Sequence, residues 1–109
     1  MIYLFISKSY SNHNMDIVLN IIEVLPESIG KLTSLKDLIL GKNFINTLPE
    51  SIGNMSSLKN LDIGENPIKK LPDSILNLKK LETLFMKGLD KEFSVVNLLL
   101  KQKKVSILK

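Results

Sequence analysis

LPESIG at Leu25–Gly30 returns unchanged at Leu48–Gly53 and in a looser form, LPDSIL, at Leu71–Leu76. Each copy begins 23 residues after the copy before it. A second pattern follows within each unit, because LxxLxLxxN at Leu35–Asn43 becomes LxxLxIxxN at Leu58–Asn66. A fixed period of this length is typical of a solenoid, in which every unit forms one turn and packs only against its neighbours.

These motifs resemble the leucine-rich repeat family, and in particular its intracellular members whose units open with LPxSIGxLxxL. Such units occur in plant Ras-group repeat proteins, in related signalling scaffolds and in bacterial and protist relatives. The resemblance covers at least residues 25–84. It implies an α/β fold: a short right-handed solenoid with a parallel β-sheet on its concave face and short helical or 3-10 segments on its convex face.

The period organises all 109 residues as one repeat domain. We divide it into a degenerate N-terminal unit, three repeats and a C-terminal cap, which span 1–24, 25–47, 48–70, 71–90 and 91–109. The first unit keeps the phase of the repeat, since Asn20 stands where Asn43 and Asn66 stand later, and polar substitutions suit a terminal unit. The alternative is that 1–10 is foreign sequence at a truncation.

Short strands are predicted at Leu38–Leu40 and Leu61–Ile63, where residues alternate between buried and exposed. Consecutive units place these strands side by side in a parallel sheet. Outward-facing residues on the concave face are the candidate partner-binding residues. They are Lys36, Asp37, Ile39, Lys59, Asn60, Asp62, Glu82, Thr83 and Phe85. Ile39 and Phe85 are the apolar members, and exposed apolar groups among charges often mark interaction sites.

Pro26, Pro49 and Pro72 suit the first turn of a short helical segment, because proline has a fixed φ and no N–H to satisfy. Gly30 and Gly53 are expected to end these segments in the left-handed conformation. The third unit has Leu76 there, so its segment is expected to run on toward Asn77. Asn20, Asn43 and Asn66 are assigned a structural role by the resemblance: their amides satisfy backbone groups where each strand ends.

Beyond Leu89, which replaces the expected asparagine, the pattern becomes less regular. Residues 91–104 predict a helix with Phe93, Val96 and Leu100 on one line. Residues 105–108 predict a last short strand. If one residue is inserted relative to the repeat, Leu108 takes the core place of that strand.

The residue types give little support for catalysis. The chain has no cysteine and one histidine, His13, so it offers neither a thiolate nucleophile nor a cysteine metal site. A general base needs a placed partner, and nothing in the sequence places one beside His13. The glycines recur with the repeat and lack phosphate-loop spacing. We therefore expect no enzyme activity, no cofactor and no metal.

Met1–Ile6 is apolar but too short for a signal-peptide core or a membrane span. Secreted relatives usually carry cysteine-rich caps, so the resemblance favours a cytoplasmic protein, which we expect to be a monomer. The net charge of +4 is modest. Four lysines of the tail contribute much of it: Lys101, Lys103, Lys104 and Lys109.

The leading hypothesis is a scaffold that binds another protein on its concave face. The resemblance implies a signalling role, with small GTPases as one possible class of partner. A second hypothesis is that the basic C-terminal helix binds nucleic acid or an anionic membrane; a capping helix with solvated lysines is favoured over it. A third is that the chain is a fragment of a larger receptor or repeat-fused enzyme.

Overall fold

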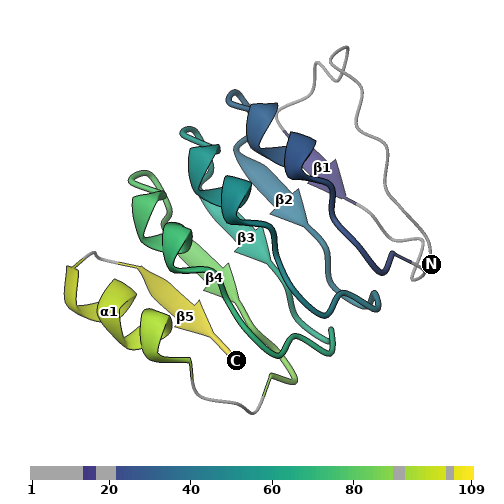
Figure 1. Ribbon diagram of the computed structural model, residues 1–109. Helices are drawn as coiled ribbons and strands as arrows, with labels where there is room; N and C mark the ends of the chain where they lie inside the picture. The colour runs from purple at the N-terminus through teal and green to yellow at the C-terminus, as the bar shows by residue number, and fades with distance from the viewer. Residues whose placement is uncertain (1–13, 17–21, 90–92, 103–104) are drawn as a thin grey trace.

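Five short strands lie side by side in one parallel sheet, and a layer of helical segments covers its inner side (Figure 1). The computed structural model describes residues 14–16, 22–89, 93–102 and 105–109. The strands, in spatial as well as sequence order, are β1 (Asn14–Asp16), β2 (Asp37–Ile39), β3 (Asn60–Asp62), β4 (Thr83–Phe85) and β5 (Ser106–Leu108). The predicted parallel solenoid is confirmed, and its strands begin one residue earlier than predicted.

Three 3-10 segments and one α-helix form the opposite layer. They are η1 (Glu27–Lys31), η2 (Glu50–Asn54), η3 (Asp73–Asn77) and α1 (Ser94–Gln102). A proline in extended conformation directly precedes each 3-10 segment. η3 ends at Asn77 as expected, but η1 and η2 have the same length, so Leu76 does not prolong the segment.

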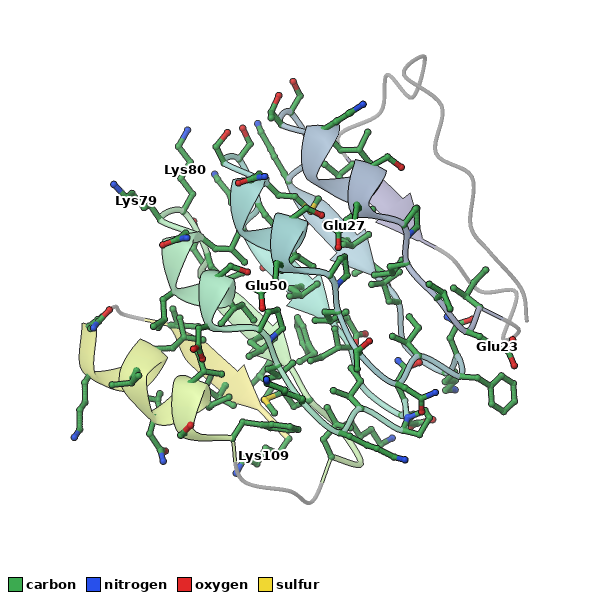
Figure 2. All side chains as sticks on the ribbon, viewed as in Figure 1. Glu23, Glu27, Glu50, Lys79, Lys80 and Lys109 are labelled. Carbon is green, nitrogen blue, oxygen red and sulfur yellow. The ribbon has the colours of Figure 1, made fainter. Side chains whose placement is uncertain are left out.

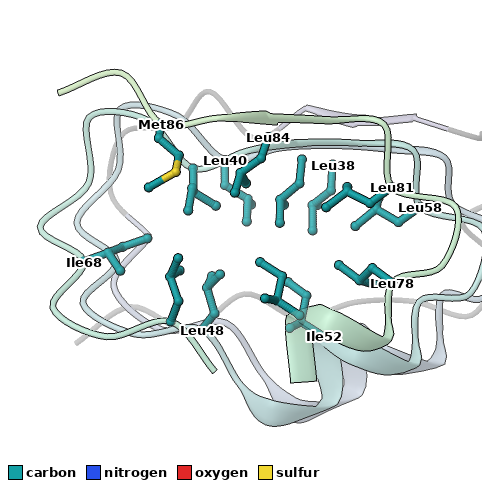
Figure 3. Close-up of a cluster of buried hydrophobic side chains, with 14 of the residues drawn as sticks. Leu38, Leu40, Leu48, Ile52, Leu58, Ile68, Leu78, Leu81, Leu84 and Met86 are labelled. Carbon is teal, nitrogen blue, oxygen red and sulfur yellow. The ribbon is translucent and has the colours of Figure 1, made fainter. Parts of the chain in front are cut away.

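The core is a flat column between the two layers. Leu38, Leu61 and Leu84, the middle residues of three strands, are completely buried, and Ile52 faces them from η2. Figure 3 views this column along the solenoid and shows strand leucines opposed by Leu48, Ile52 and Leu78 from the other wall. One unit cannot enclose such a column alone, so each turn depends on the turns beside it.

Gly30 and Gly53 lie inside η1 and η2 and do not have a positive φ, so the predicted left-handed role is wrong. Glycine is required at these two positions because adjacent units pack closely there. A Cβ on Gly53 would lie 2.5 Å from the backbone oxygen of Ser74 and 2.8 Å from its Cβ, and Gly30 meets Ser51 in the same way. Leu76 escapes this restriction because the longer helix α1, and not another 3-10 segment, follows η3.

Gly53→Ala is expected to lower the free energy of unfolding by about 1–3 kcal/mol, because the clash with backbone atoms can be relieved only by separating two units. Gly41→Ala is the matched control, since its Cβ would meet only side-chain and backbone oxygens at 3.4 Å or more. Urea denaturation followed by circular dichroism would compare the two. Equal stability of both variants would show that units 48–70 and 71–90 do not touch this closely.

The left-handed residues lie instead in the turns that follow β2, β3 and β4. Lys42 (φ 61°), Glu65 (φ 54°) and Gly88 (φ 78°) occupy equivalent places 23 residues apart. The turn geometry is therefore set by the repeat, and two non-glycine residues adopt it despite its usual steric cost.

Buried asparagines close the first two of these turns. The side chain of Asn43 accepts a hydrogen bond from the Ile22 N–H at 3.1 Å and donates one to the Leu40 carbonyl at 3.0 Å. Asn66 repeats the arrangement with the Ile45 N–H at 3.1 Å. At Leu89 the backbone N–H bonds to the Met86 carbonyl, so that turn closes through the backbone. Asn20 lies outside the described residues.

The C-terminal helix packs against η3 with Val95, Val96 and Leu99 buried, while Leu98 and Leu100 are exposed. Of the predicted apolar line, Phe93 and Val96 are therefore in the core and Leu100 is not. In the part of the chain that the structure describes, no helix has the length and apolar character needed to cross a membrane.

The last strand was predicted one residue out of register. Thr83 pairs with Ser106, Leu84 with Ile107 and Phe85 with Leu108, so the 23-residue step continues without an insertion. Ile107 takes the core place, and Leu108 faces outward and is 47% exposed.

Candidate functional site

The nine candidate residues gather on the solvent-facing side of β2, β3 and β4, which we call the outer sheet face. Strand register aligns Asp37, Asn60 and Thr83 in one column and Ile39, Asp62 and Phe85 in another. A third column lies just before the strands, where the N–H of Lys59 bonds to the carbonyl of Lys36 and that of Glu82 to the carbonyl of Lys59. The sequence repeat therefore predicted which residues become neighbours.

Two columns are polar: one is formed by Asp37, Asn60 and Thr83, and the other by Lys36, Lys59 and Glu82. Part of their hydrogen-bonding capacity is used within the face. The Asn60 side-chain amide donates to the Asp37 carboxylate. Lys36 and Glu82 are exposed, and Lys59 is half-buried between them. Because Lys36 is basic and Glu82 is acidic, this column changes from positive charge beside β2 to negative charge beside β4.

The column of Ile39, Asp62 and Phe85 carries the apolar part of the face. Ile39 and Phe85 are half-buried, and β5 adds the exposed Leu108 next to Phe85. Sequence reasoning missed Leu108 because it assumed an inserted residue. The signal that could have found it is the unbroken 23-residue spacing from Thr83 to Ser106.

A groove of about 330 Å³ opens where this column meets the turns that follow the strands. Its lining residues are Ile39, Gly41, Lys42, Asp62, Gly64, Glu65 and Lys87. Gly41 and Gly64 leave the space open because they project no side chain into it. Lys42 and Glu65 were not among the predicted residues, since their place on the rim depends on the left-handed turns.

Two carboxylates and two ammonium groups surround this groove. Asp62 is held in orientation, because its Oδ1 accepts a hydrogen bond from the backbone N–H of Gly64 at 2.9 Å. Glu65 lies across from Lys87, with 3.6 Å between Oε1 and Nζ. The rim is therefore charged but balanced, and Asp62 is the acidic group set between the apolar residues Ile39 and Phe85.

Within the described ranges, no group of three or more histidine, cysteine, aspartate or glutamate side chains could hold a metal ion. His13 lies outside those ranges. What the face offers chemically is recognition, through shallow apolar contacts beside fixed charges.

Comparison with known proteins places the repeat in context. A family model described as a leucine-rich repeat region matches residues 18–105. Among solved structures, the chain is similar to the leucine-rich repeat protein LIC12759 of Leptospira interrogans, with 31% identity and a TM-score of 0.69. The match covers 79% of this chain and 22% of that one, so this chain spans about a fifth of its length. No curated protein matches the chain.

Proposed function

Because this chain belongs to the leucine-rich repeat family, whose members generally mediate contacts between proteins, we propose that it binds a partner protein through the outer sheet face. The partner is a protein segment that lies across the strands. A scaffold role in cytoplasmic signalling is the setting that the sequence resemblance favours.

One observation carries this proposal: the column of Ile39, Asp62, Phe85 and Leu108 presents three apolar side chains beside a groove and is bordered by charges. The core does not require these side chains, because the buried position of each strand is its middle residue. Apolar contacts with a polar rim are the usual composition of a protein interface. Aromatic residues such as Phe85 are favoured at the centre of such interfaces.

The competing reading of α1 as a nucleic-acid or membrane-binding helix receives less support. Its buried residues Val95, Val96 and Leu99 close the end of the core, which leaves only Leu98 and Leu100 as exposed apolar side chains. This patch beside Lys101 is too small for an amphipathic surface helix, which needs a continuous apolar face.

The proposal is tested by capture of partners from an extract of the cells that make the protein. We expect Phe85→Ala, alone and combined with Ile39→Ala, to reduce the amount of captured partner at least about tenfold, as substitution of a centrally placed interface residue does. Double reversal of Lys36 and Lys59 to glutamate should weaken capture less and in a salt-dependent way. Quantitative mass spectrometry of the bound proteins is the measurement.

The control variants lie on the opposite side of the molecule. Figure 2 shows Glu27 and Glu50 on the helical layer, away from the sheet. Alanine at both positions should leave the captured set unchanged. If the two sides behave alike, or if Phe85→Ala captures the same proteins in the same amounts as the unmodified chain, then the outer sheet face is not the binding surface.

A further inference from the structure

We propose that the groove beside Asp62 receives an arginine side chain of the bound partner segment. The inference rests on the proposed function, because it names which side chain the outer sheet face selects. Its first support is the position of Asp62, which stands between Ile39 of β2 and Phe85 of β4 in strand register. Adjacent strands lie about 4.8 Å apart, so the three side chains form one continuous short surface.

The second support is the state of the Asp62 carboxylate. The Gly64 N–H fixes its orientation through Oδ1, and the group is only half-buried. An ionised carboxylate has about four acceptor positions, so one backbone bond leaves capacity for a ligand. A carboxylate that is already oriented loses little freedom when a donor arrives.

The third support is the match between the groove and the arginine side chain. The planar guanidinium can make two parallel bonds to a carboxylate. It also stacks on aromatic faces, and Phe85, although it does not line the groove, is the residue paired with Asp62 on the next strand. The aliphatic stem of arginine packs on apolar surface, which Ile39 provides. Because Gly41 and Gly64 leave the groove open, the stem can lie over the backbone.

The rim charges narrow the proposal to a single basic side chain. Lys42 and Lys87 both line the groove, and Glu65 opposes Lys87. A run of several basic residues would bring more charges of the same sign as Lys42 and Lys87, whereas one arginine beside neutral or acidic residues brings only the charge that pairs with Asp62. The opposite occupant, a partner carboxylate on Lys42, is the alternative that the experiment must separate.

The test uses the full chain labelled with ¹⁵N and three small probes, so no partner has to be known. N-acetyl-arginine amide is titrated against N-acetyl-citrulline amide, which has nearly the same shape without the charge, and against N-acetyl-aspartate amide. The backbone amide resonances of Gly41 and Gly64 report on the groove. We expect arginine to bind about two- to fivefold more tightly than citrulline, the upper part of the range of a partly exposed charged pair.

Two variants establish the role of the carboxylate. Asp62→Asn keeps an oxygen that can accept the Gly64 N–H and removes the charge, so it should abolish the difference between arginine and citrulline. Glu50→Gln removes an exposed carboxylate from η2, on the opposite side of the molecule, and it should change nothing. Raising the salt concentration should weaken the arginine shifts and leave the citrulline shifts unaltered.

The inference is overturned if arginine and citrulline shift the glycine resonances equally in the unmodified chain, or if only the aspartate probe does. Either result is independent of how any variant folds. Loss of partner capture in Phe85→Ala together with no preference for arginine would leave the proposed function standing and remove this inference. Conversely, a preference for arginine together with partner capture that the face variants do not change would remove the proposed function and leave the arginine-binding groove standing.

Discussion

Leu61→Ala is expected to lower the free energy of unfolding by about 2–5 kcal/mol, as buried leucine-to-alanine changes do. Leu61 is completely buried at the middle of β3, with Leu38 and Leu84 at the same place on the neighbouring strands. The cavity would open in the centre of the column, where neither end of the array can collapse into it. Since domains of this size have about 5–15 kcal/mol of stability, the loss is a large fraction of the total.

Urea denaturation followed by far-ultraviolet circular dichroism measures this effect. Leu98→Ala is the matched control, because the same side chain is 42% exposed on α1, and its effect should stay within about 0.5 kcal/mol. A Leu61→Ala variant as stable as the control would mean that the interior of the solenoid is not close-packed at β3.

Asn66→Ala is expected to be the second most damaging change. The Asn66 side chain accepts a hydrogen bond from the Ile45 N–H and donates to the carbonyls of Leu40 and Ile63 at 2.9 and 3.1 Å. It thus joins the turn of its own unit to the preceding unit. Each buried group left without a partner costs about 1–3 kcal/mol, so we expect a total loss of about 3 kcal/mol.

Amide hydrogen exchange distinguishes this mechanism from simple loss of packing. The N–H of Ile45 should exchange much faster in Asn66→Ala, because its acceptor is gone. Asn97→Ala, on the exposed surface of α1, is the control and should alter neither stability nor exchange at Ile45. Unchanged protection of Ile45 would show that Asn66 does not hold this turn.

Much of the architecture follows from local pattern. The 23-residue step predicted which residues become cross-strand neighbours, because a parallel ladder between identical units places equivalent residues side by side. The spacing of leucines predicted the buried column, since strand residues alternate between two faces. Both rules depend only on the separation of residues along the chain.

The role of Gly30 and Gly53 could not be predicted from the sequence of their own units. A glycine near the end of a helical segment usually indicates a left-handed residue. Here the limit is the distance to Ser51 and Ser74 in the next unit. That distance depends on how tightly two turns stack, which no single unit encodes.

By itself, the sequence determined the repeat, the strand register of its regular units, the inward leucines and the residues that share the outer sheet face. Only the tertiary structure decided between an inserted residue and an unbroken step before β5, and thereby placed Leu108 beside Phe85. It also showed that Lys42 and Glu65 stand at the rim of a groove. The physical reason is that periodicity specifies equivalence between units. The space between side chains depends on backbone conformation and on distances between units, and these exist only once the turns are stacked.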